Sequence, residues 1–535
     1  MVRAGDLRVR GMIVTVGGQV PRAGELAVFC RPVVTAPAVV RRDGTVLAGG
    51  WLPDFARLGE LERHLGDGVI EEIAGAAIAA GRLKPRQRRR IMSYPLVIRL
   101  MIAMVLMPDA SYREALARLA GLLADIPFAR EWHIPTEKVI TDWRRLVPAG
   151  VMEEIFWHAA GPLAGDDELS AVMLAGMPVC AADGMLVNLA DTPPNRAFFG
   201  STGTADDSSP FPQLRVVAVT ARGGRAMLGA ILGQPAAGEQ TLLKRLVKRR
   251  PELFAGRVIC FDRNFPGHEL ITAILDAGGH VVARVREGLS LPFEDGPGRG
   301  WLSDGSRLTW LNAPSGRKAD RLPVRAAEHN VILPGDDGTH EVSETCTVIT
   351  TLLDHQAAPA DQVRETYLTR WSASETTFGE DKTTITGAGN RTSGPVLRSG
   401  SPRLVIQEAW AWLTSTQLVR AGEAGALRGP HAAARALRRK DSAPVTADEE
   451  SFTAARHHMI RSMATAQVTA SSSLEALAAA ADAAARAILH TLNVPGRQRH
   501  SRRAQKARPK FPHIAATKTT VTGKPKVTVF APGFA

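Results

Sequence analysis

Short apolar runs between turn residues, from Met177 to Arg286, constrain the fold of this chain more than any other feature. The runs of strand length are 178–182, 187–189, 214–220, 226–232, 257–261 and 280–286. The turn-forming pair Asp183-Gly184 separates the first two, which predicts strand, turn, strand. Leucines at helical spacing follow at 242–247 and 270–275. Hairpinned strands followed by strand, helix and strand predict an α/β fold, a mixed sheet with helices on its faces.

The region before this sheet has a different pattern. Residues 1–50 show no helical period and are expected to form a loosely ordered or weakly β leader. From residue 51 to about residue 150, apolar residues recur at helical spacing, which predicts an all-helical N-terminal domain. Its basic segments make DNA binding a plausible role, and a solvated basic surface is the alternative. The apolar run 94–107 is shorter than the roughly 20 residues that a bilayer requires, so it predicts a buried helix.

The region after residue 286 interrupts the sheet. Residues 288–345 hold Gly, Pro and Asp turns around short strand-like pieces and predict an inserted, β-rich subdomain. The sheet is expected to resume at 345–351, and helices to follow from residue 360. We therefore assign 165–480 to one α/β domain that contains this insertion. Length alone favours several domains for a chain of 535 residues.

Charge points to a polyanionic partner. Lys and Arg exceed Asp and Glu by a formal +13, which favours nucleic acid, with an anionic membrane surface as the competing partner. The segment 495–535 has no Asp or Glu and carries ten Lys or Arg. It is expected to be disordered when free, and either to bind DNA as a basic arm or to be a solvated tail. The scattered cysteines lack a CxxC pair, which fits a reducing cytosol.

Three carboxylates are placed for chemistry. Asp183 and Asp262 each follow an apolar run, and Glu375 lies on a helix expected after the last strand. Side chains at strand ends meet in the crevice where ligands bind, and converging carboxylates repel one another unless a cation lies between them. Mg²⁺ prefers such oxygen ligands, and a pair of ions would serve an in-line displacement at phosphate. For Glu375 alone, a salt-bridged solvated helix is the alternative.

The motifs together resemble the IS4-like DDE transposases of bacterial insertion sequences. They are Asp183-Gly184 after an apolar strand, the block from Phe261 to Phe265, and the set Tyr367, Arg370, Glu375 and Lys382. The resemblance implies an RNase H-like fold interrupted by a β-rich insertion. It also implies that Asp183, Asp262 and Glu375 hold two Mg²⁺ ions, which Mn²⁺ could replace.

The resemblance further implies a set of DNA contacts. Arg370 and Lys382 would neutralise phosphates, Tyr367 would hydrogen-bond one, and Arg263 lies beside Asp262. Trp301 or Trp310, within the insertion, would stack on a flipped base, and ordinary packing is the alternative for both.

The third carboxylate has a competitor. The family pattern places three residues between its Arg and its Glu, whereas four separate Arg370 from Glu375. The six residues between Glu375 and Lys382 match the pattern. We therefore prefer Glu375 as the third ligand and keep Glu380 as the alternative.

The sequence thus predicts a cytoplasmic, nucleoid-associated DNA transposase of cut-and-paste type. Its partners would be double-stranded DNA, namely the element ends and the target, and a second copy of the chain in a homodimer. No membrane partner is expected. The alternatives are a catalytically inactive, transposase-derived DNA-binding protein and an RNase H-like nuclease without strand transfer.

Overall fold

The fold is taken from a computed structural model of the chain. The structure describes residues 39–40, 46–47, 64–66, 68–85, 92–120, 133–164, 172–201, 211–286, 291–292, 300–334, 340–368, 375–380, 397–400, 401–439, 442–446, 449–465, 474–492 and 526–529. Most of the expected leader lies outside these ranges. Within it, β1 (Val39–Val40) and β2 (Val46–Leu47) form a short antiparallel pair.

The described residues between 64 and 164 are helical or connect helices. The helices are α2 (Val69–Ala79), α3 (Tyr94–Leu106), α4 (Tyr112–Ala120), α5 (Glu137–Leu146) and α6 (Ala149–Ala164). Ser93 begins α3, because its Oγ accepts a hydrogen bond from the Leu96 amide at 3.3 Å. This helix is buried on all sides, and its one charge, Arg99, pairs with Glu71 at 2.7 Å. The expected buried helix at 94–107 is confirmed. Within the described residues, no helix is both long and apolar enough to cross a bilayer.

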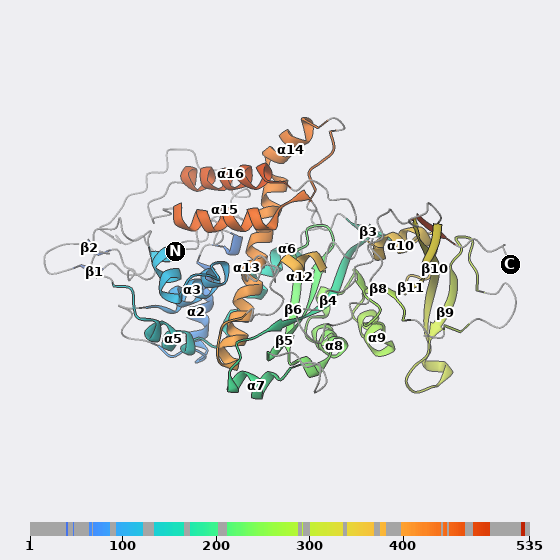
Figure 1. The fold of residues 1–535 in the computed structure, drawn as a ribbon, viewed down its shortest axis with the longest axis horizontal. Coiled ribbons are helices and arrows are strands. Elements are labelled where there is room, and N and C mark those ends of the chain that lie inside the picture. Colours follow the sequence, from blue (N-terminus) through green and yellow to red (C-terminus); the bar gives the residue numbers. More distant parts are fainter. Residues whose placement is uncertain are drawn as a thin grey trace, which may run out of the picture.

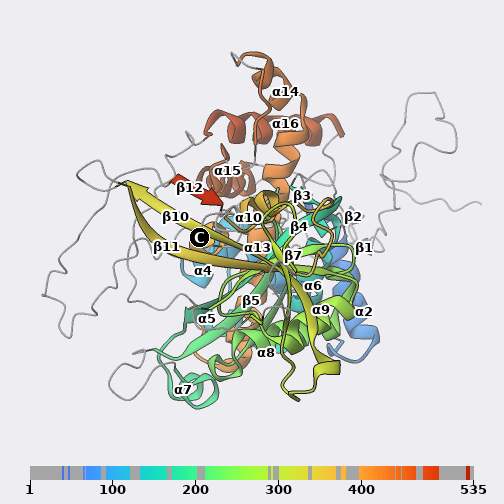
Figure 2. The same ribbon diagram turned by 90° about the vertical axis from the view of Figure 1, so that its right-hand side faces the viewer.

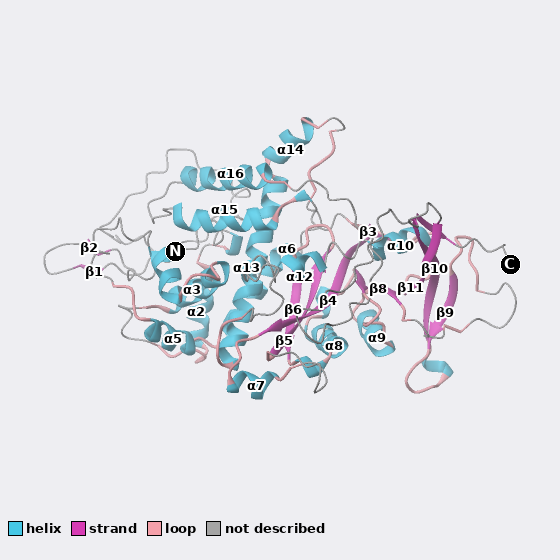
Figure 3. Cartoon of the chain, viewed as in Figure 1, coloured by secondary structure: helices cyan, strands magenta, loops and turns pink. Residues whose placement is uncertain are grey.

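The main sheet is mixed and occupies the centre of the molecule (Figure 3). Its strand order is β12-β10-β11-β8-β7-β4-β5-β6, with β3 (Met173–Leu174) on β4 and β9 on β10. The central strands are β4 (Met177–Asn188), β5 (Gln213–Ala221), β6 (Met227–Gly233), β7 (Val258–Phe261) and β8 (His280–Arg284). The β4–β7 and β7–β8 pairs are parallel, and the other pairs are antiparallel. The expected mixed sheet with flanking helices is confirmed.

Strand β4 corrects one prediction. The pair Asp183-Gly184 was expected to turn the chain, but both residues stay inside one continuous strand from Met177 to Asn188. Asp183 pairs with Ala218 of β5, and Gly184 pairs with Val217. A strand with a neighbour on each side gains ladder hydrogen bonds along its length, and these outweigh the local turn preference.

Helices cover both faces of the sheet. On one face α8 (Glu239–Arg249) and α9 (His268–Asp276) bury alternate strand residues such as Cys180, Val217 and Ile259. On the other face α10 (Ala360–Leu368) covers β7 and β8, and α13 (Pro402–Arg428) covers β5 and β6 together with α6. Successive side chains along each strand point to opposite faces of the sheet, so each strand contributes residues to both cores.

The expected insertion is rich in strands, but it is not separate from the sheet. Its strands are β9 (Arg307–Leu311), β10 (Leu322–Pro334) and β11 (His340–Thr350). Because β11 pairs with β8, this region extends the central sheet, and Figure 2 shows its two long strands leaving the body of the molecule. Four residues of the basic tail also correct a prediction. They form β12 (Lys526–Val529), which pairs with β10.

The remaining helices lie around α13 (Figure 1). They are α14 (Pro430–Leu437), α15 (Phe452–Thr465) and α16 (Leu474–His490), and a short helix, α7 (Pro193–Phe199), lies near the start of α13. One core is shared by α13, the N-terminal helices and one face of β4, β5 and β6. The assigned boundaries at residues 51, 150, 165, 480 and 495 stay predictions.

Arg398 joins the segment before α13 to the N-terminal helices. Its guanidinium donates to the carbonyl oxygens of Ala110 at 2.7 Å and Met104 at 3.0 Å, and it lies 4.9 Å from the centre of the Tyr112 ring. These carbonyls are at and just beyond the C-terminal end of α3, where a helix leaves acceptors without partners. The Arg398 guanidinium therefore supplies hydrogen-bond donors to the carbonyl oxygens at the end of a buried helix.

We expect Arg398→Ala to destabilise the fold by about 2–3 kcal/mol, because hydrogen bonds from a charged donor are lost and buried acceptors remain. Urea unfolding measures the change. Arg403→Ala is the matched control, since Arg403 is exposed on α13 and should change stability by less than about 0.5 kcal/mol. Equal midpoints for the two variants would contradict the role given to Arg398.

Candidate active site

Two of the expected carboxylates lie side by side at the centre of the sheet. In the parallel pair of β4 and β7, Ala181 is level with Cys260. Two residues further along each chain, Asp183 is level with Asp262, which directly follows Phe261 at the end of β7. Neighbouring strands are about 4.8 Å apart, so the backbones of the two aspartates are near neighbours. The expectation that they converge is supported, although Asp183 lies within its strand and not at its end.

Short hydrogen bonds orient both carboxylates. Asp183 Oδ1 accepts from the Gly184 amide at 2.8 Å. Asp262 Oδ1 accepts from the Asn264 amide at 2.8 Å, in the turn that follows β7. Both side chains are half-buried. These hydrogen bonds fix the direction in which each carboxylate points.

Glu239, the first residue of α8, is a carboxylate of this site that the sequence did not indicate. Its Cγ and Oε1 lie 2.5 and 2.7 Å from the point where a Cβ on Gly184 would be, so the glycine makes room for it. Arg215 of β5 pairs with Glu239 at 2.5 Å. Burial raises the pKa of Glu239, Arg215 opposes the rise, and the charges of Asp183 and Asp262 add to it. The only signal in the sequence was an acidic residue at a helix start.

The third expected carboxylate is at the start of a short helix. Glu375 is the first residue of α12 (Glu375–Glu380), and its side chain is outside the described residues. Its competitor Glu380 is at the other end, where Arg225 lies 3.4 Å from Oε1 and Arg420 contacts Oε2. Two arginines thus occupy the oxygens of Glu380, which favours Glu375 as the ligand. Arg370 and Lys382 lie outside the described residues.

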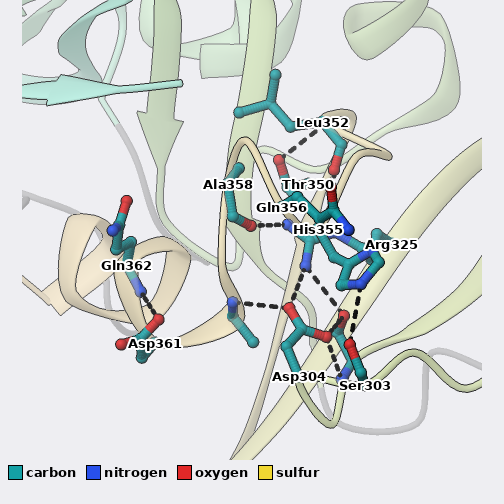
Figure 4. Close-up of polar contacts among 12 residues, drawn as sticks. Ser303, Asp304, Arg325, Thr350, Leu352, His355, Gln356, Ala358, Asp361 and Gln362 are labelled. Carbon is teal, nitrogen blue, oxygen red and sulfur yellow. Dashed lines mark hydrogen bonds and ion pairs between the residues drawn. The ribbon is translucent and has the colours of Figure 1, made fainter. Parts of the chain in front are cut away.

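Tyr367 is on α10, half-buried against the core beneath β7 and β8. The start of this helix is fixed by Asp304, whose Oδ2 accepts from the Ala360 amide and from Arg325, both at 2.9 Å (Figure 4). Burial raises the pKa of Asp304, but hydrogen bonds from Ser306 and Ala360 and the charge of Arg325 lower it further, to below its ordinary value. Asp304 is therefore ionised at neutral pH and holds α10 in place.

The remaining expected DNA contacts are at the surface or in the β-rich region. Arg263 is exposed, and its carbonyl oxygen accepts from Arg286 at 3.1 Å. Trp301 is 39% exposed. Trp310, on β9, is half-buried with the Arg321 guanidinium 4.6 Å from its ring centre. Of the two, Trp301 has the open ring that a base could stack on.

The donor set suits Mg²⁺ in part. Asp183 and Asp262 supply hard oxygen ligands at one level, which is the ligand chemistry that Mg²⁺ prefers. Among the described residues, no group of three His, Cys, Asp or Glu side chains is arranged to hold a metal ion. The side chain of Glu375, the ligand that the resemblance adds, is outside the described residues.

Comparison with known proteins adds independent information. Residues 56–157 match a family described as insertion element 4 transposase N-terminal. The chain is also 23% identical over 364 residues to the transposase InsG for insertion sequence element IS4 of Escherichia coli (strain K12), covering 66% of this chain and 75% of InsG. Both matches support an IS4-like transposase. The resemblance drawn from its motifs is confirmed.

The chain is also similar in structure to a solved transposase complex. It is the piggyBac transposase synaptic complex with hairpin DNA, determined by cryo-electron microscopy. The match has a TM-score of 0.39 and 11% identity, and it covers 79% of this chain and 84% of the other.

Glycine at position 184 is predicted to be required. Gly184→Ala would place a methyl group within 2.5–2.7 Å of the Glu239 side chain, so that carboxylate must move. We expect a loss of about 1–3 kcal/mol in unfolding free energy, measured by thermal melting. Gly161→Ala, in α6 with open space around it, is the control and should be neutral or stabilising. Equal melting temperatures for Gly184→Ala and the unmodified chain would contradict the contact.

Proposed function

We propose that this chain is a DNA transposase that cleaves at the ends of an insertion element and joins them to target DNA by a cut-and-paste reaction. The observation that carries the proposal is the pair Asp183 and Asp262, level on parallel strands in an IS4-like chain. The fold would be RNase H-like, with the helices before residue 150 contributing to recognition of the element ends. The site of action would be the bacterial cytoplasm, on the nucleoid.

In this proposal Asp183, Asp262 and Glu375 would hold two Mg²⁺ ions, with Mn²⁺ as a substitute. When bound, the ions supply activation of the attacking oxygen and stabilisation of the leaving one. The chain itself would hold the DNA. Arg370, Lys382 and Arg263 would bind the backbone of the double-stranded DNA, each by placing a positive charge beside a phosphate.

Tyr367 would donate a hydrogen bond to a phosphate, and Trp301 or Trp310 would stack on a flipped base. A homodimer would bring two element ends together. The charge of +13 supports a polyanionic partner, since counterions released from DNA favour binding.

Two other functions explain part of the same features. A transposase-derived protein that only binds DNA would keep the basic surface, but it would have no use for two oriented aspartates. An RNase H-like nuclease without strand transfer would use the aspartates, but it would have no need of an N-terminal region like that of IS4 transposases. We therefore prefer the transposase.

Replacing either aspartate tests the chemistry. Asp183→Asn and Asp262→Asn are each expected to reduce cleavage of a cognate element end in Mg²⁺ below detection, because a neutral amide is a poor ligand for the cation. DNA affinity should change little, as a gel-shift assay would show. Asp276→Asn, an exposed carboxylate at the end of α9, is the control and should cleave normally. Cleavage by either active-site variant at the unmodified rate would exclude the assigned site.

The same cleavage assay, together with a measurement of Mn²⁺ binding, decides whether Glu375 or Glu380 is the third metal ligand. Glu375→Gln should abolish cleavage and weaken Mn²⁺ binding. Glu380→Gln should weaken Mn²⁺ binding less than Glu375→Gln does, because arginines already occupy the Glu380 oxygens. Lost Mn²⁺ binding in Glu380→Gln and normal binding in Glu375→Gln would reverse the assignment.

The basic tail gives a second prediction for DNA binding. The test variant has Gln in place of the seven Lys and Arg residues from Arg497 to Lys510. These substitutions do not change the residues of β12. We expect weaker DNA binding, and a slope of log affinity against log salt that is less steep by about 1 or more. The control replaces uncharged Ser and Thr residues of the tail by Gln, with no change in charge. An unchanged slope would leave the tail without a role in DNA contact.

A further inference from the structure

A buried group of charges lies where α12, α13 and the turn between β5 and β6 meet. We call it the arginine cluster, and its members are Arg225, Glu380, Arg420, Glu423 and Glu450. The side chains of Arg225 and Arg420 are only 4% and 1% exposed. Charges removed from water are costly unless paired, so these arginines must be held by their partners.

Glu380 is the member that links separate elements. Its Oε1 lies 3.4 Å from Arg225 Nη1, on the β5–β6 turn, and its Oε2 contacts Arg420 Nη2, on α13. The last residue of α12 is therefore held from two directions, by the sheet and by the longest helix.

Arg225 has an unusual backbone. Its φ is +55°, in the left-handed region that side chains other than glycine seldom adopt. The turn fixes this conformation, since the Arg225 amide donates to Ala221 O at 3.1 Å and the Ala221 amide donates to Ala226 O at 2.8 Å. Glycine would be less strained at this position than arginine. The presence of a bulky cation here indicates that the Arg225 side chain has a function.

Arg420 is fixed independently. It also pairs with Glu423 at 2.7 Å, and its guanidinium lies 4.4 Å from the centre of the Phe452 ring. Burial raises the pKa of Glu423 and raises that of Glu450 well above its ordinary value, and the charge of Glu423 adds to the rise at Glu450.

The geometry relates the cluster to the aspartates. Glu375 is five residues from Glu380, about 7.5 Å along a helix axis. On β5, Ala218 faces Asp183 and lies three residues before Ala221, at which the Arg225 turn begins, about 10 Å along the strand. Phe378 of α12 and Ala218 of β5 belong to one core, so α12 lies over the sheet face on which Ala218 pairs with Asp183.

We propose that Arg225 and Arg420 are positioning residues that fix α12 through Glu380 and so set the place of Glu375 in the active site. This inference rests on the proposed function, in which Glu375 completes the site. The cluster thus acts on the reaction without touching DNA or metal.

Arg225→Gly tests whether the Arg225 side chain positions α12. Glycine adopts a φ of +55° without strain, which offsets part of the cost of the lost ion pair, so the variant should stay folded with a lowered melting temperature. Cleavage of a cognate DNA end should fall about tenfold or more in kcat with KM unchanged, because a displaced catalytic group mainly affects the chemical step. Hydrogen exchange of the α12 amides should accelerate about tenfold.

Controls make the result specific. Ala175→Gly relieves the same kind of backbone strain, at φ +51° in the β3–β4 turn, and should cleave and exchange normally. Arg225→Lys keeps the charge and should recover part of the rate. Glu380→Gln, which removes the partner, should accelerate α12 exchange as Arg225→Gly does.

Normal kcat and normal α12 exchange in Arg225→Gly would overturn the proposal. Recovery of the cleavage rate by Arg225→Ala, when Arg225→Lys does not recover it, would overturn the proposal as well. Failure of the proposed function is a different result. In that case the unmodified chain does not cleave, or Asp262→Asn cleaves equally well, and hydrogen exchange still decides whether the cluster holds α12.

Discussion

The burial of α13 between the N-terminal helices and the sheet is the constraint on which the rest of the structure depends. This helix is apolar through its centre, with Trp412 fully buried, and also carries polar groups that need partners. Gln407 donates to the carbonyls of Arg144 and Val147, and the Met227 amide of β6 donates to Gln417. Each of these bonds joins α13 to a segment far away in sequence, so the helical and α/β regions form one packed unit.

Much of the fold followed from the sequence, because the apolar patterns were local and strong. The runs at 214–220, 226–232 and 257–261 became β5, β6 and β7, and the leucines at 242–247 became the buried face of α8. The continuity of the β-rich region with the central sheet could not be predicted. Its attachment depends on pairing between β8 and β11, which are distant in sequence and meet only through tertiary contacts.

The candidate site was predictable in its aspartates and not in its surroundings. Asp262 ends a strand as its local sequence indicated, whereas Asp183-Gly184 has the composition of a turn and lies inside β4 because β5 and β7 flank it. Glu239 and Arg215 meet across elements that no spacing rule relates. The same holds for Glu380, whose two arginines come from a hairpin turn and a helix on either side of it in the chain.

The pairing of β12 with β10 changes what the basic segment before it can be. The described elements that flank this segment, α16 before it and β12 after it, both belong to the fold. Fixing the two ends of a chain segment removes part of its entropy before any ligand arrives. A polyanion that binds the segment would therefore meet a chain whose ends are already placed, which lowers the entropy that binding must remove.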